Sequence, residues 1–228
     1  MFEQNKTPLE RPTPYTVLTS CREPATLVIF LIGPPNNQSK FFVHKEFACY
    51  HSPVLSAAFN STFLEGQTQT YELEDTTEGA FRLLVQWLYS QKLTLLQLED
   101  QHQFQEGKTI ADAAEDKNLA ELWVLADKLA IPKLQNAAID SMEQIRLVGR
   151  MVVVSVWAYA YDIAGPDSHL RHYVVAICAL LATKDLAQWG SVFPHGMLLK
   201  LACLFKDQLM GIRDNQIVME RYHVSEMD

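Results

Sequence analysis

The stretch of sequence that decides the fold reads Phe41-Phe42-Val43-His44-Lys45-Glu46-Phe47 and continues, a turn later, with Ser52-Pro53-Val54-Leu55-Ser56-Ala57-Ala58-Phe59. The apolar side chains up to Val43 favour a strand that ends at His44-Lys45. Ser52 is a typical helix N-cap, and Pro53 suits the first helical position because its missing N–H is not needed there. The pattern predicts one strand followed by two short helices.

The flanking segments add two more strands. Residues 26–32 are continuously apolar and β-branched, which predicts a strand buried on both faces. Gly33-Pro34-Pro35-Asn36-Asn37 is rich in turn residues, so we expect this strand to form a hairpin with residues 40–43. Tyr71 and Leu73 alternate with polar neighbours, as in a third strand.

Helices are predicted for most of the remaining chain. Thr76 or Thr77 is expected to cap a helix whose apolar residues recur at helical spacing, namely Phe81, Leu84, Val85 and Leu88. A helix is predicted from residue 118 up to Pro132, and another begins near Leu134. The later helices are expected over residues 151–163, 169–181 and 195–209.

Three features of these segments shape the expected organisation. Residues 151–161 and 173–182 are too apolar to face water, so we expect them to lie between other helices. Residues 1–24 are rich in proline and are expected to form a flexible arm. Residues 95–116 are polar and acidic, which favours a solvated loop.

Composition argues against several classes of protein. The chain has 228 residues and a formal net charge of −8, which disfavours a nucleic-acid partner. Its apolar runs fall short of the roughly 20 residues that span a bilayer, so no membrane partner is expected. Its four cysteines form no Cys-x-x-Cys pair and no secretory signal is visible, which favours reduced thiols in the cytoplasm or nucleus.

The candidate chemical groups are better explained by structure than by catalysis. We find no nucleophile elbow and no phosphate-binding glycine loop, so we predict no catalytic residue and no cofactor. His44 is expected to be a structural, hydrogen-bonded histidine beside an exposed Lys45. His169 and His172 could present two imidazoles to a metal, but no matching thiol or carboxylate motif accompanies them, so no metal site is predicted. The tryptophans at positions 87, 123, 157 and 189 are expected in the core.

The order of predicted elements over residues 26–142 resembles the BTB/POZ domain. The residues that carry the resemblance are Phe42, His44, Lys45, Phe47, Ser52, the Ala57-Ala58-Phe59 helix end, Tyr71-Glu72-Leu73, Phe81, Leu84, Trp87-Leu88-Tyr89 and the string from Leu122 to Leu134. That last string is similar to the single-domain BTB proteins common in fungi. Phe47 stands where leucine is usual in the family, and the proline-rich arm does not look able to supply the N-terminal helix of a strand-swapped dimer.

The resemblance implies an α/β (α+β) fold in which a small mixed sheet is covered by helices. Residues 25–142 would form the BTB/POZ domain, with 95–116 as a loop insert, and residues 143–228 an all-helical extension. The implied function is non-enzymatic protein–protein interaction, with an adaptor of a cullin-based ubiquitin ligase as its sharpest form. Such adaptors often carry a hydrophobic-x-Glu motif, and Phe104-Gln105-Glu106 has that form, which makes Phe104 and Glu106 candidate partner-binding residues.

Two alternatives stay open at this point. The chain could instead be a homo- or hetero-oligomeric scaffold, with itself as partner, acting in transcriptional regulation. A remote alternative is a small ligand-binding or enzymatic protein with a pocket between the C-terminal helices.

Overall fold

The computed structural model describes residues 26–100, 102, 109–149, 154–181, 188–208 and 219–225. The expected arm of residues 1–24 and the Phe104-Gln105-Glu106 motif lie outside these residues. The elements are, in chain order, β1 (Leu27–Ile32), β2 (Ser39–His44), α2 (Lys45–His51), α3 (Pro53–Phe59), α4 (Leu64–Thr68), β3 (Thr70–Leu73), α5 (Glu78–Ser90), η1 (Leu96–Leu98), α6 (Ile110–Lys128), α7 (Pro132–Gly149), α8 (Val154–Ile163), α9 (His169–Ala179), α11 (His195–Gln208) and η2 (Met219–Arg221).

The three strands form the expected mixed sheet, in the order β2-β1-β3. The central strand β1 pairs antiparallel with β2 and parallel with β3. The expectation that β1 is buried on both faces was wrong, because its side chains alternate: Val28 and Phe30 are buried, whereas Leu27 is 47% exposed. Within the described part of the chain, helices bury only the face of the sheet to which Phe30 belongs.

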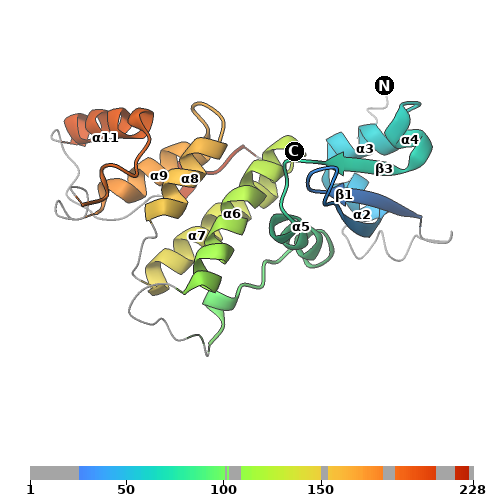
Figure 1. The fold of residues 1–228 in the computed structure, drawn as a ribbon, viewed down its shortest axis with the longest axis horizontal. Helices are drawn as coiled ribbons and strands as arrows, with labels where there is room; N and C mark the ends of the chain where they lie inside the picture. Colours follow the sequence, from blue (N-terminus) through green and yellow to red (C-terminus); the bar gives the residue numbers. More distant parts are fainter. Residues whose placement is uncertain are drawn as a thin grey trace, which may run out of the picture.

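The core begins on that face and continues from the sheet through the described helices up to α11. Phe30 contacts the rings of Phe59 and Phe81, with centroid distances of 5.7 and 5.0 Å. From α5 the same cluster of buried side chains extends through α6 and α7 into α8, α9 and α11. Figure 1 shows this succession, with the sheet and α2 to α4 at one end, α5 to α7 in the middle and α8 to α11 at the other. The architecture is thus a small α+β unit continued by helices.

The connection between α5 and α6 differs from the expected solvated loop. The prediction was wrong for residues 110–116, because α6 begins at Ile110 rather than near residue 118. A capping box starts the helix, in which Thr109 and Asp112 each accept a hydrogen bond from the other's backbone N–H. Polar composition suggested exposure, but Gln97 and Asp112 are buried.

A polar cluster around Glu121 connects α5, α6 and α8. Its carboxylate accepts hydrogen bonds from the hydroxyl of Thr77, which is the N-cap of α5, and from the hydroxyl of Tyr159 on α8. Burial, followed by the hydrogen bond to Glu121, raises the pKa of Tyr159. Lys117, one turn before Glu121, lies over the Tyr159 ring at 4.7 Å. This cluster holds the C-terminal helices against the sheet-containing unit.

The C-terminal helices pack as their composition predicted. Trp157 on α8 and Tyr173 on α9 are buried, and their rings meet edge to face at 6.0 Å. Trp189, which was expected in the core, is 41% exposed just before α11. The boundary expected between residues 142 and 143 falls inside α7 (Pro132–Gly149).

Candidate interaction site

The connection from α3 to β3 is a compact turn that contains the short helix α4, which the sequence analysis did not predict. Ser61 accepts a hydrogen bond from the backbone N–H of Phe63 and donates one to the carbonyl of Ala58. At the other end, the side-chain amide of Gln69 donates to the carbonyls of Phe59 and Gly66, at 3.0 and 2.6 Å. These bonds tie both ends of the turn to the end of α3.

Close packing fixes this turn as well. Gly66 lies so near Ser61 that a Cβ atom added to the glycine would stand 2.0 Å from the Ser61 carbonyl oxygen. Gln69 has a positive φ of 51°, a conformation that costs energy for a residue with a side chain. The surrounding hydrogen bonds hold it in that conformation, so the turn is well determined.

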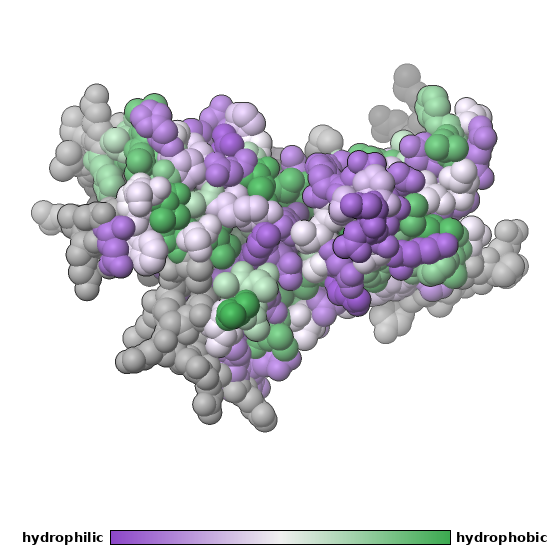
Figure 2. Space-filling view, viewed as in Figure 1, coloured by the Kyte–Doolittle hydropathy of each residue, from purple (hydrophilic) through white to green (hydrophobic). Residues whose placement is uncertain are grey.

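This well-determined turn presents two large apolar side chains to solvent. Phe63 is 75% exposed and Leu64 is 70% exposed. We call Phe63, Leu64 and Glu65 the α4 tip. Figure 2 shows hydrophobic surface over α4 at the outer end of the molecule. Glu65 is half-buried in the first turn of α4, and its charge adds to burial in raising the pKa of Tyr71.

Two of the residues that carry the family resemblance, Lys45 and Ser52, hold α3, the helix that leads into this tip. Lys45 was expected to be exposed, but it is half-buried and its Nζ donates a 2.9 Å hydrogen bond to the carbonyl of Phe59 at the end of α3. Ser52 is fully buried, accepts a hydrogen bond from the N–H of Leu55, and donates one to the carbonyl of Leu129, the C-cap of α6. Both side chains therefore fix where α3, and with it the α4 tip, lies.

His44 has the hydrogen bonds of a structural residue. The hydroxyl of Tyr89 lies 2.7 Å from His44 Nδ1 and accepts a 3.0 Å hydrogen bond from the His44 backbone N–H. Because this hydroxyl already accepts from the backbone, its single hydrogen is available for Nδ1. The ring of Phe47 packs on Tyr89 at 4.6 Å. The arrangement connects the end of β2 to the end of α5.

Most of the other residues that carry the resemblance lie in the core. Those that are buried in the first core around the sheet are Phe47, Phe59, Phe81, Leu84 and Leu88. Phe42 differs, because it is 58% exposed on the outer face of β2, with the ammonium of Lys40 5.1 Å from its ring centre.

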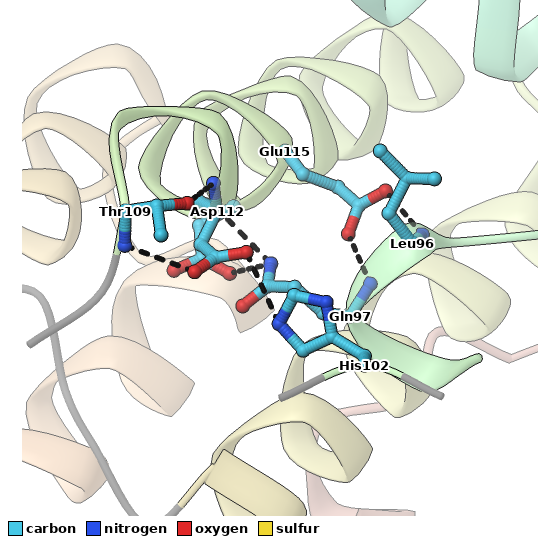
Figure 3. Close-up of polar contacts among 7 residues, drawn as sticks. Leu96, Gln97, His102, Thr109, Asp112 and Glu115 are labelled. Atoms are coloured by element: carbon cyan, nitrogen blue, oxygen red, sulfur yellow. Dashed lines mark hydrogen bonds and ion pairs between the residues drawn. The ribbon is translucent and has the colours of Figure 1, made fainter. Parts of the chain in front are cut away.

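The flanks of the Phe104-Gln105-Glu106 motif form a polar cluster, shown in Figure 3. Phe104 and Glu106 lie outside the described residues, and the chain is described again on either side of them. On one side, His102 Nε2 lies 3.3 Å from Asp112 Oδ1. On the other, Thr109 begins α6. The contact brings the two flanks of the motif together.

The same cluster secures the segment before the motif. Glu115 on α6 accepts hydrogen bonds from the backbone N–H groups of Leu96 and Gln97, at 2.8 and 3.1 Å. The Gln97 side-chain amide donates to the carbonyl of Asp112 and to the carboxylate of Asp116. These carboxylates therefore bind backbone and amide groups of their own chain, which is a structural use.

The described residues offer little to a metal ion. No three His, Cys, Asp or Glu side chains in them gather closely enough to hold one. Burial, followed by the charge of Lys200, lowers the pKa of His172 on α9.

Among the residues that the structure describes, no helix combines the length and apolar character needed to cross a bilayer.

Sequence reasoning missed the α4 tip, although a signal was present. Phe63-Leu64-Glu65 has the same hydrophobic-x-Glu form as Phe104-Gln105-Glu106. The form is too short to select between two occurrences, and only the structure adds that Phe63 and Leu64 point into solvent.

Comparison with known proteins gives two findings. Residues 28–146 match the family model of the BTB/POZ domain, which is just over half of the chain. A curated relative, the BTB and MATH domain-containing protein 38 of Caenorhabditis elegans, is 29% identical over 121 residues. That match covers 48% of this chain and 31% of the relative, so the chain corresponds to less than a third of the relative's length.

Proposed function

Because the chain belongs to the BTB/POZ family, whose domain is a protein–protein interaction module, we propose that it is a non-enzymatic adaptor that recruits substrates to a cullin-based ubiquitin ligase. The observation that carries the proposal is the α4 tip, where Phe63 and Leu64 are exposed on a turn held by hydrogen bonds. Large apolar side chains in such a position are typical of partner contacts.

The physical mechanism is insertion of an aromatic anchor. Phe63 would enter an apolar pocket on the scaffold while Glu65 lies at the rim, where a carboxylate can meet polar groups. Because the turn is already fixed by Gly66 and Gln69, little conformational entropy remains to be lost on binding. This preorganisation supports the α4 tip as the contact.

The test is the affinity of the purified chain for a purified cullin scaffold, measured by biolayer interferometry. Truncating a central aromatic anchor costs about 2 kcal/mol or more, so Phe63→Ala should weaken binding by about 30-fold. Phe42→Ala is the matched control, because Phe42 is also an exposed phenylalanine but lies on the sheet. Binding by the Phe63→Ala chain that equals wild type would exclude the α4 tip.

A third variant, Phe104→Ala, distinguishes between the two hydrophobic-x-Glu motifs as the cullin contact. Phe104→Ala should leave the affinity within about twofold of wild type if the α4 tip makes the contact. If Phe104→Ala abolishes binding and Phe63→Ala does not, the motif before α6 is the contact. No measurable binding of the wild-type chain would remove the cullin proposal itself.

A second candidate, self-association as a scaffold, is favoured by the outer face of the sheet. Leu27 and Phe42 are exposed there, and Ile29, which pairs with Phe42 in the ladder, is half-buried. An apolar sheet face of this kind can be covered by a second copy. Light scattering of the full chain should then give a dimer mass that Phe42→Lys reduces to that of a monomer. A monomer at high micromolar wild-type concentration would contradict this candidate.

A further inference from the structure

The described C-terminal residues 219–225 return across the molecule to α7. They begin with η2 (Met219–Arg221) and have no regular structure from Tyr222 onward. Three successive residues contact α7 or α9, each through a different kind of interaction: Tyr222, His223 and Val224. We call residues 219–225 the tail.

The first interaction recognises the backbone of the tail. The side-chain amide of Asn136 on α7 pairs with both main-chain groups of Val224: its Oδ1 accepts from the Val224 N–H at 2.9 Å, and its Nδ2 donates to the Val224 carbonyl at 3.3 Å. A side-chain amide that satisfies both groups of one residue acts like a neighbouring strand. This pairing is compatible with any residue at position 224 except proline, which has no backbone N–H.

The second interaction selects charge. His223 Nε2 lies 2.8 Å from Asp140 Oδ1, one helical turn along α7 from Asn136. The Asp140 carboxylate remains 43% exposed with the tail in place. A histidine, lysine or arginine at this tail position would therefore be attracted, and an acidic residue repelled.

The third interaction selects shape. The ring of Tyr222 meets the ring of Tyr173 edge to face at 5.6 Å. Below it, Glu143 on α7 accepts a hydrogen bond from the Tyr173 hydroxyl and two from Arg146. Asn136, Asp140 and Glu143 are spaced four and three residues apart, so they line one face of α7.

We propose that Asn136, Asp140, Glu143 and Tyr173 form a peptide-binding face, which the chain's own tail occupies until a partner displaces it. The partner is a protein with a short segment of aromatic, basic and aliphatic residues in the order of Tyr222, His223 and Val224. An attached tail has an effective concentration in the millimolar range, so the face is closed to weak competitors. The inference concerns a second surface and does not depend on the cullin proposal.

The test uses the full chain and a fluorescent peptide of residues 219–225, with fluorescence anisotropy as the readout. Val224→Pro in the chain removes the N–H that pairs with Asn136 and should release the tail. The released chain should bind the peptide at least tenfold more tightly than wild type does. A peptide of the same composition in scrambled order is the control, and Tyr222→Ala is a second releasing variant should Val224→Pro lose its helical circular dichroism.

A charge exchange provides the sharper result. In the released chain, Asp140→Lys should lower the affinity for the wild-type peptide about tenfold and raise the affinity for a peptide that carries His223→Glu. Such a reversal requires direct contact, since a merely structural Asp140 would not change the preference between peptides. The proposal is overturned if neither releasing variant gains affinity, if the scrambled peptide binds equally well, or if Asp140→Lys leaves the preference unchanged.

Discussion

Replacing Ser52 by alanine should destabilise the fold strongly although it removes one atom. The hydroxyl is fully buried and joins two helix ends, accepting from the Leu55 N–H at 3.0 Å and donating to the Leu129 carbonyl at 2.6 Å. Loss of a serine N-cap costs about 1 kcal/mol. Leaving a buried carbonyl without its donor costs about 1–3 kcal/mol more. We therefore expect a loss of about 2–4 kcal/mol in the free energy of unfolding.

Urea unfolding followed by tryptophan fluorescence measures this loss, because Trp87, Trp123 and Trp157 are buried. With a urea dependence of about 2–3 kcal/mol per molar, the midpoint should fall by about 1 M. Ser56→Ala is the matched control: Ser56 lies inside α3, where alanine is the best helix former, so its change should stay within about 0.5 kcal/mol.

A further variant separates the two roles of the hydroxyl. Glycine at an N-cap costs only a few tenths of a kcal/mol, so whatever Ser52→Gly loses beyond about 0.5 kcal/mol is due to the Leu129 carbonyl. If Ser52→Ala and Ser56→Ala change stability equally, the reasoning that the hydroxyl holds α3 against α6 is refuted.

Three other perturbations have defined outcomes. Burial and then the charge of Lys133 lower the pKa of His51 to about 4, whereas in the unfolded chain it titrates near its ordinary 6.5. As pH falls, the unfolded state therefore binds the proton before the folded state does. The free energy of unfolding should decrease by roughly 1–2 kcal/mol between pH 6.5 and pH 4, a value discounted for the partial exposure of His51. Urea unfolding at pH 7 and pH 4.5 should show a smaller decrease for His51→Gln than for wild type. Gly66→Ala should cost about 2 kcal/mol in thermal unfolding and weaken cullin binding, because its Cβ would meet the Ser61 backbone, which cannot rotate away. Tyr159→Phe should cost about 1–2 kcal/mol in urea by removing the hydrogen bond to Glu121.

Each of these three has a control and a contradicting result. An unchanged pH dependence in His51→Gln would mean that other groups cause the acid sensitivity. Gly165→Ala is the control for Gly66→Ala, because no atom lies within 4 Å of an added Cβ at Gly165; equal losses would contradict the steric reasoning. For Tyr159→Phe, a stability equal to wild type would show that the hydroxyl does not help to hold α8.

Local sequence signals predicted the first half of the fold well. Ser52 and Pro53 mark the start of α3 in the sequence and do so in the structure, because capping depends on neighbours in the chain. The strand β1 was found, but its burial was not, since an apolar run cannot reveal whether helices cover one face of a sheet or two.

Predictions failed where distant residues decide the outcome. Gln97 and Asp116 were expected to be solvated, yet they are buried together, where the Gln97 side-chain amide donates a hydrogen bond to the Asp116 carboxylate. The α4 tip escaped notice because exposure of Phe63 results from the path of the turn, which Gln69 and Gly66 fix through contacts that composition does not show. The tail contacts with Asn136 join residues 88 positions apart, far beyond any local pattern.

The continuity of α7 has a mechanical consequence. One uninterrupted helix belongs both to the region that matches the BTB/POZ family and to the part that follows it, where α8, α9 and α11 are packed. A cargo held at that far end could not swing as on a flexible tether, because bending a packed helix breaks its hydrogen bonds. In the proposed adaptor role, the chain would act as a fixed bracket, and the angle at which it presents a bound protein would decide which surface lysines of that protein come within reach of a ligase.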